Sequence, residues 1–256
     1  MRQALPALLL AVSSLALAQE GANRLATRPG LEIGGQLAYY DYKEPNFAEI
    51  KGNRLGIVAS GTVVGGSLFE RLDVRASYGS LDYQGSGSAS GVPDLILETR
   101  AVAGFDWALK GATLSPYTGL GYRYLYDDLT GYSSTGAAGY RRYSHYFYIP
   151  VGLTLRADLG SWVLAPTVEY DFFVQGKQKS MLSDVNPTFS NPINTQNYGN
   201  GYRLYLMFER DTLTVGPYLH YWHIQNSDVQ PIGGGLFGLE PENYTREYGL
   251  ELRFRF

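Results

Sequence analysis

The sequence contains no cysteine and only three histidines, His145, His220 and His223, in 256 residues. The missing cysteine excludes disulfides, thiolate catalysis and cysteine metal sites. Three histidines leave few candidates for acid–base chemistry. The net charge of −3 at pH 7 offers no basic surface for nucleic acid. We therefore expect no nucleic-acid partner, no cofactor and no metal.

Long apolar runs are also missing after residue 18, which excludes membrane-spanning helices. The first 18 residues differ from the rest of the chain. Arg2 supplies a positive start, 4–18 is an apolar stretch too short to span a bilayer as a helix, and Ala16-Leu17-Ala18 is a small-x-small pattern that signal peptidase recognises. We predict a cleavable signal peptide over 1–18 and a single domain over 19–256, exported across the inner membrane.

Tyrosine and glycine are abundant instead, with 22 and 31 residues. Apolar and polar residues alternate at period two through most of the mature chain, which predicts strands. The last segment shows the pattern best. One face carries Tyr248, Leu250, Leu252, Phe254 and Phe256, and the opposite face carries charged residues. We predict ten strands, at 30–42, 52–64, 68–83, 94–109, 113–126, 140–157, 161–175, 201–210, 212–225 and 244–256.

The connections between these segments alternate in length. Those at 43–51, 84–93, 127–139, 176–200 and 226–243 are long and rich in Gly, Ser, Asn and Pro, and we expect the Gly85–Gly91 stretch to be a flexible loop. The others are tight turns such as Gly65-Gly66-Ser67. Transmembrane barrels have an even number of strands, short periplasmic turns and longer extracellular loops. The predicted fold is all-β: a transmembrane antiparallel up-and-down β-barrel with both termini in the periplasm.

The same alternation places ten arginines and nine acidic residues on the inward face, whereas the five lysines fall in loops, turns or strand ends. The planar guanidinium forms the paired contacts with carboxylates that a confined space requires. We predict a charge network that largely fills the lumen and includes Glu98, Arg100, Arg123, Arg156, Glu169, Asp171, Arg203, Glu251 and Arg253. Such a lumen would make a poor wide pore.

The chain resembles the small Gram-negative outer-membrane barrels grouped with the opacity proteins and the membrane domain of outer-membrane protein A. Its terminal Tyr248-x-Leu250-x-Leu252-x-Phe254-x-Phe256 resembles the C-terminal signal read by the barrel-assembly machinery. The resemblance implies an outer-membrane location, with outer-membrane lipid, lipopolysaccharide and the assembly machinery as partners. Because the chain ends on its last strand, we expect no periplasmic domain that binds peptidoglycan.

The histidines carry the only candidate chemistry. His220 and His223 are three residues apart, so they lie on opposite strand faces and cannot share a metal. Ser144 and His145 also lie on opposite faces, which prevents the simplest pairing of nucleophile and base. His220 could lie near Asp82, Asp127 or Asp128 at the rim, and that is the one constellation suited to proton transfer.

The nine tyrosines between residues 117 and 148 are mostly explained by girdles at the membrane interface. We predict a non-enzymatic barrel with no catalytic residue, whose surface loops serve adhesion or recognition of an unidentified extracellular ligand. A narrow porin-like channel for small solutes is the first alternative, and a hydrolase at the rim is the second.

Overall fold

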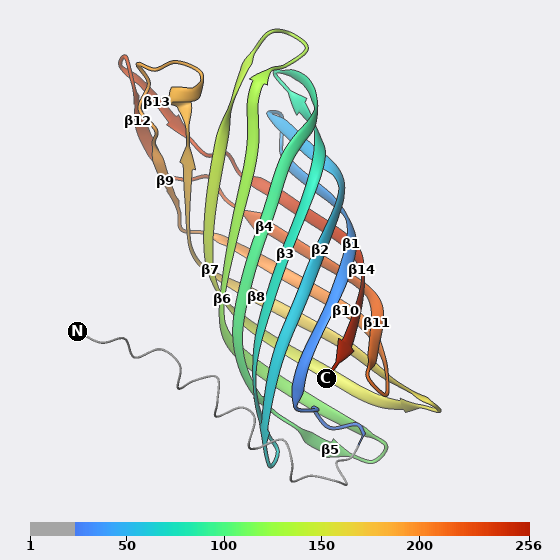
Figure 1. Ribbon diagram of the computed structural model, residues 1–256. Helices are drawn as coiled ribbons and strands as arrows, with labels where there is room; N and C mark the ends of the chain where they lie inside the picture. Colours follow the sequence, from blue (N-terminus) through green and yellow to red (C-terminus); the bar gives the residue numbers. More distant parts are fainter. Residues whose placement is uncertain (1–23) are drawn as a thin grey trace, which may run out of the picture.

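The structure is a computed structural model and describes residues 24–256, so the predicted signal peptide lies outside the described part. Ten long strands form a closed barrel (Figure 1): β1 (Gly30–Glu44), β2 (Ala48–Gly65), β3 (Leu68–Gly85), β4 (Gly87–Phe105), β6 (Ala112–Tyr132), β7 (Ala138–Leu159), β8 (Trp162–Ser180), β10 (Gly199–Arg210), β11 (Leu213–Ile224) and β14 (Asn243–Arg255). Neighbouring strands pair antiparallel, and the β1–β14 and β8–β10 pairings close the ring. The predicted all-β, ten-stranded barrel is confirmed.

The remaining elements are short. They are β5 (Trp107–Leu109), which continues β4 after Asp106, the 3-10 turn η1 (Leu182–Asp184), β9 (Ile193–Gln196), and a hairpin of β12 (Val229–Gly233) and β13 (Leu236–Leu239). None of the helices in residues 24–256 is long and apolar enough to cross a membrane.

The two ends of the barrel differ. We call the end with the tight turns at 66–67, 110–111, 160–161 and 211–212 the base; β1 begins and β14 ends there. The opposite end, the crown, carries the connections at 45–47, 86, 133–137, 181–198 and 225–242. In Figure 1 the crown rises as two groups of strands, one of which contains β9, β12 and β13.

Three of the five predicted long loops are wrong, because the strands run on through them and turn within a few residues at 45–47, 86 and 133–137. The Gly85–Gly91 stretch, expected to be a flexible loop, is part of the β3–β4 hairpin. Neighbouring hairpins support each other there. The Ser88 N–H donates to Ser134 Oγ at 3.0 Å, and the Ser134 N–H donates to the Ser88 carbonyl at 2.8 Å. Pairing between backbones therefore outweighs the loop-like composition.

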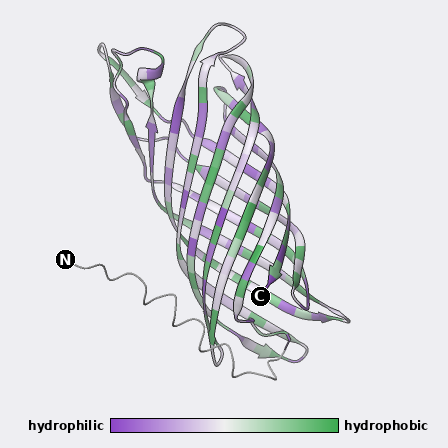
Figure 2. Cartoon of the chain, in the orientation of Figure 1, coloured by the Kyte–Doolittle hydropathy of each residue, from purple (hydrophilic) through white to green (hydrophobic). Residues whose placement is uncertain are grey.

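Outward side chains form an apolar belt around the barrel. Leu55, Ile57 and Leu120 are each more than two-thirds exposed, as expected of side chains that face lipid. Tyr122 and His145 mark the crown edge of the belt, where a 2.7 Å hydrogen bond joins them. Beyond that edge the outward residues become polar, among them Lys43, Asp82, Gln84 and Lys177. Figure 2 shows the alternation of hydrophobic and hydrophilic residues along these strands.

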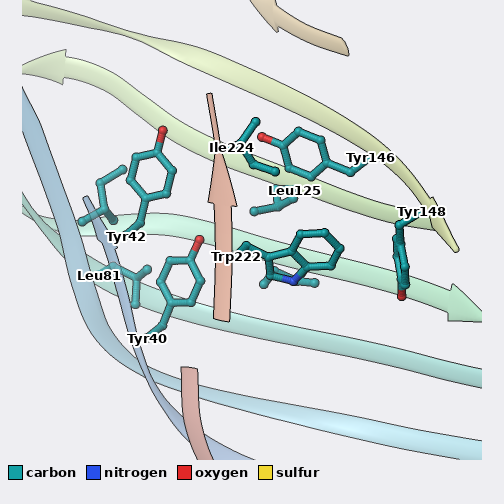
Figure 3. Packing of buried hydrophobic residues seen from close by; sticks show 10 residues of the cluster. Tyr40, Tyr42, Leu81, Leu125, Tyr146, Tyr148, Trp222 and Ile224 are labelled. Atoms are coloured by element: carbon teal, nitrogen blue, oxygen red, sulfur yellow. The ribbon is translucent and has the colours of Figure 1, made fainter. Parts of the chain in front are cut away.

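Large apolar side chains also fill the crown half of the lumen. A cluster of ten buried residues gathers there from seven of the ten strands (Figure 3): Tyr40, Tyr42, Ile50, Leu81, Ile96, Leu125, Tyr146, Tyr148, Trp222 and Ile224. The Tyr148 and Trp222 rings meet edge to face, with centroids 5.0 Å apart. Aromatic side chains therefore occupy space that a water-filled pore would need.

Glycines on neighbouring strands make room for these inward tyrosines. Gly121 faces Tyr148 across the β6–β7 ladder, and a Cβ at Gly121 would lie 2.1 Å from the tyrosine ring. The same arrangement recurs in three other facing pairs: Gly152 with Tyr117, Gly176 with Tyr146, and Gly249 with Tyr218. We call these the four Gly–Tyr pairs. An aromatic ring lying over a glycine fills the missing side-chain volume and favours one register.

The assignment of most tyrosines between residues 117 and 148 to membrane girdles needs correction. Tyr117, Tyr146 and Tyr148 point inward and are buried. Tyr122, Tyr124, Tyr126 and Tyr143 point outward. Of the other two, Tyr132 is exposed at the end of β6, and Tyr140 shares the strand parity of the buried Arg142. Residue parity along each strand separates the two sets, because successive side chains point to opposite faces.

Candidate functional site

The centre of the lumen is organised around Arg203 on β10, which is 1% exposed. Its Nε lies 2.7 Å from Asp171 Oδ2 and 3.0 Å from Glu169 Oε1, both on β8. Its Nη2 donates to Glu98 Oε1 on β4 at 2.6 Å and to the Tyr148 hydroxyl at 2.9 Å. One guanidinium therefore joins three carboxylates from two walls of the barrel.

Two further arginines extend this network. Arg100 donates to Glu169 Oε1 at 2.6 Å and to Asp73 Oδ2 at 2.8 Å. Arg75 Nε lies 3.1 Å from Glu98 Oε2, and its Nη1 contacts Glu247 on β14. Because Glu98 and Glu169 are each shared between two guanidiniums, the charges form one connected group rather than isolated pairs.

The remaining predicted network residues lie nearer the base, with one exception. Arg253 Nε is 2.6 Å from Glu251 Oε1, and Arg156 Nε is 3.5 Å from Glu209 Oε1. Arg123 has no carboxylate within 4.0 Å in the described part of the chain, contrary to our expectation. Its guanidinium lies 5.4 Å from the Trp222 ring centroid instead. Glu98 is its register neighbour on β4, but that carboxylate is bound by other arginines.

Sequence reasoning missed several inward acids at the crown. Arg54 pairs with Asp94, and its guanidinium stacks 3.5 Å from the Tyr40 ring centroid. Asp94 could have been identified, because it shares the strand parity of Glu98. Glu44 and Glu240 lay in segments predicted to be loops, so no pattern marked them as inward.

Glu44 and Glu240 both bind Arg142 on β7. The distances from the guanidinium are 2.7 Å to Glu44 and 2.5 Å to Glu240, and Tyr42 accepts a third bond at 2.7 Å. We call this group the crown clamp, since Glu240 belongs to the 225–242 connection. Burial, and next the neighbouring Glu44, raise the pKa of Glu240 to about 7, although Arg142 opposes the shift.

Every strand of the ring contributes a buried side chain to the middle of the lumen. Ten such residues, which we call the central plug, are each at most 2% exposed: Tyr40, Arg54, Ser77, Ile96, Arg123, Tyr148, Asp171, Arg203, Trp222 and Glu247. Side chains this deeply buried do not line a water-filled pore.

Residues 24–29, which we call the strap, cross the base opening before β1 begins. Arg24 Nη2 donates to the Gly160 carbonyl at 2.7 Å, in the turn between β7 and β8. The Thr27 N–H donates to Asp106 Oδ2 at 2.6 Å, and Arg28 Nη1 donates to the Asp211 carbonyl at 2.6 Å. Because β7 lies opposite β1 in the ring, the strap spans the opening. The sequence pattern gave no sign of it.

His220 does not form the predicted rim site; the histidine that meets a carboxylate at the crown is His223, whose Nε2 lies 2.5 Å from Glu242 Oε1. His220 faces the lumen and is 4% exposed, with Nε2 2.7 Å from the Tyr205 hydroxyl and Nδ1 3.9 Å from Glu247 Oε1. Its predicted proximity to Asp82, Asp127 or Asp128 is wrong, because it lies deeper than those residues. His223 points outward and stacks on Tyr244 with ring centroids 4.6 Å apart. Within residues 24–256 no group of three His, Asp or Glu residues could hold a metal ion.

The sequence matches no protein-family model and no curated protein. Solved structures are similar to it: the outer membrane protease OmpT from Escherichia coli has a TM-score of 0.57 at 10% identity, with 89% of this chain and 97% of that chain covered. The translocator domain of autotransporter NalP from Neisseria meningitidis has a TM-score of 0.42 at 11% identity, covering 90% of each chain.

Neisserial surface protein A has a TM-score of 0.36 at 11% identity, with 89% of this chain and 97% of that chain covered. At such identities a similarity concerns the fold alone, and only the first TM-score is high enough to support that. Together with the closed antiparallel ring and the apolar belt, it confirms the expected resemblance: the chain has the fold of the outer-membrane β-barrels.

Proposed function

We propose that this protein is a closed, non-enzymatic outer-membrane barrel that presents its crown for recognition or adhesion and does not conduct solutes. The central plug carries the proposal. All ten strands contribute to it, and its members are bonded or packed against one another, as Arg203 is to Asp171 and Tyr148. A solute would have to displace several buried ion pairs at once to pass.

The location and orientation form part of the same proposal. The apolar belt suits the outer membrane, with outer-membrane lipid and lipopolysaccharide around it. The base, with its short turns and both ends of the barrel, would face the periplasm, and the polar crown the outside. The exposed aromatic face that ends at Phe256, with Tyr248, Leu250, Leu252 and Phe254, would be read by the barrel-assembly machinery.

The crown suits recognition because loops carry specificity on a rigid scaffold. Aromatic side chains are exposed at three separate tips: Phe47 between β1 and β2, Tyr132 at the end of β6, and Phe237 on the β12–β13 hairpin. A partner would meet these tips first. The hydrolase alternative is less well supported. His220 lies 3.9 Å from the Glu247 carboxylate and is buried in the lumen. His223 lies 2.5 Å from Glu242, but it points outward and stacks on Tyr244.

The narrow-channel alternative rests on two small cavities in the base half of the lumen, of about 90 and 30 Å³. Conductance of the purified barrel in planar bilayers distinguishes the two functions. We expect no stepwise conductance from the wild-type protein. A Tyr148→Ala and Trp222→Ala double variant, which shortens two plug side chains, serves as the control and should conduct. Porin-like steps from the wild type would favour the channel.

A further inference from the structure

The larger cavity lies between the strap and the charge network, and its lining is rich in arginine. Six arginines line it: Arg28, Arg71, Arg100, Arg156, Arg253 and Arg255. Four carboxylates line the same space, from Glu32, Asp73, Glu209 and Glu251. The lining therefore carries an excess of positive charge.

Two of the four carboxylates are each shared between two arginines. Glu209 serves both Arg28, at 3.1 Å, and Arg156, at 3.5 Å. Glu32 serves Arg255 and, at 3.7 Å, also Arg253. Each of these two carboxylates thus has two guanidinium partners.

Two carboxylates outside the lining lie near the cavity. Glu169 binds Arg100 but also pairs with Arg203. Asp106 is bonded to neutral groups, the Thr27 N–H and hydroxyl and the Ser115 hydroxyl. Among the residues that line the cavity itself, six arginines face four carboxylates.

Several of these donors are not matched by an acceptor in the described part of the chain. The Nε–H groups of Arg28 and Arg255, and Nη1 of Arg255, are buried without a hydrogen-bond partner in residues 24–256. Arg156 Nε has only the 3.5 Å contact with Glu209. Arg156 as a whole is 9% exposed. Buried guanidinium donors are costly to leave unmatched. Together with the arginine-rich lining, they favour a ligand that accepts hydrogen bonds and carries negative charge.

We propose that this cavity binds a small inorganic oxyanion, phosphate or sulfate. Its volume of about 90 Å³ leaves space for a compact tetrahedral ion. The hydroxyls of Thr62 and Thr214 also line it and can donate to oxyanion oxygens. Thr27 and Arg28 of the strap form part of the wall on the base side.

Titration calorimetry of the full-length barrel in detergent, with inorganic sulfate at constant ionic strength, tests the proposal. We expect saturable binding to one site per barrel. Arg156→Gln and Arg255→Gln should each weaken binding at least tenfold. The matched control Arg246→Gln, at an exposed outward position of β14, should bind sulfate as the wild type does.

A second, milder variant guards against misfolding. Thr62→Val removes one hydroxyl and no charge, and should weaken binding several-fold while heat-modifiable migration in gels stays normal. The proposal is overturned if the folded wild type gives no saturable heat with sulfate or phosphate. Equal affinity in the wild type and in folded Arg156→Gln and Arg255→Gln proteins would overturn it too.

Discussion

At the scale of single residues, Glu98 illustrates why the buried charges of the lumen stabilise the barrel only when all their partners are present. It accepts hydrogen bonds from Arg75, Arg203 and Tyr148, and it is 5% exposed. A buried ion pair adds little net stability, because desolvation offsets attraction. Removal of one partner leaves the other charge uncompensated.

We therefore predict that Glu98→Gln lowers the free energy of unfolding by about 3–5 kcal/mol. Asp82→Asn, at an exposed outward position, should change it by less than about 0.5 kcal/mol. Reversible urea unfolding in lipid vesicles measures both. Similar stability of the two variants would contradict the charge network.

The outward face allows a test of the membrane belt. Leu153→Arg should destabilise the barrel by about 2–4 kcal/mol, because an arginine near the bilayer midplane must leave water. Gln84→Arg, an outward position beyond the crown edge of the belt, should cost almost nothing. Thr154→Arg fails for a different reason, since Thr154 is buried inward against the Thr167 hydroxyl at 2.7 Å. Equal stability of the Leu153→Arg and Gln84→Arg proteins would show that Leu153 does not lie in the apolar belt.

At the scale of elements, the crown clamp joins the 225–242 connection to β7 and β1. Glu240 faces Arg142, Glu44, Asp127 and Tyr42, and its pKa is raised to about 7 by burial. The protonated form is thus favoured when the connection is docked. The stabilisation from this group is complete below the usual carboxyl pKa, near 4.5, and is lost as the pH rises through about 7.

We predict that the 225–242 connection exchanges amide hydrogens more slowly at pH 5.5 than at pH 8.5, after correction for intrinsic exchange rates. Glu240→Gln keeps the hydrogen-bonding shape without the charge and should remove most of this difference. The β7–β8 turn at 160–161, at the opposite end of the barrel from the clamp, is the internal reference. A pH difference that persists in Glu240→Gln would assign the effect to another group.

The last strand offers a test of assembly. β14 closes the ring against β1, and the Phe256 N–H donates to the Leu31 carbonyl at 2.8 Å. Phe256 is 78% exposed, so its ring contributes little to packing within the barrel. We predict that deletion of Phe256 reduces the membrane-integrated, heat-modifiable protein several-fold, whereas Leu236→Ala in the crown does not. Normal levels of membrane-integrated protein after the deletion would show that Phe256 is not needed as an assembly signal.

Strand parity explains what the sequence could and could not predict. Alternation identified the ten strands and the inward side of Arg100, Glu169 and Arg203, because burial of one strand face leaves a pattern in every strand. The lengths of the crown hairpins were missed, since Ser88 and Ser134 bond between neighbours that composition does not reveal. The strap and Glu240 were missed for a similar reason: their partners lie far away in the chain.

At the scale of the whole molecule, the barrel is closed at three levels, by the strap, the central plug and the crown clamp. Only the clamp depends on a long connection. We predict that a short Gly-Ser turn in place of 226–242 leaves the barrel folded and non-conducting in planar bilayers, because the plug belongs to the ten strands. Conductance of this variant would show that the crown connection, and not the central plug, closes the barrel.

The four Gly–Tyr pairs have a consequence for how this sequence can change over time. Gly121 and Tyr148 fill one volume between them, so neither position can gain atoms unless the other loses some. An alanine at Gly121 would meet the ring at a distance no side chain tolerates, whereas the same change after loss of Tyr148 would be harmless. Relatives of this barrel should therefore show the two positions substituted together, as compensating partners, even where the rest of the lumen has diverged.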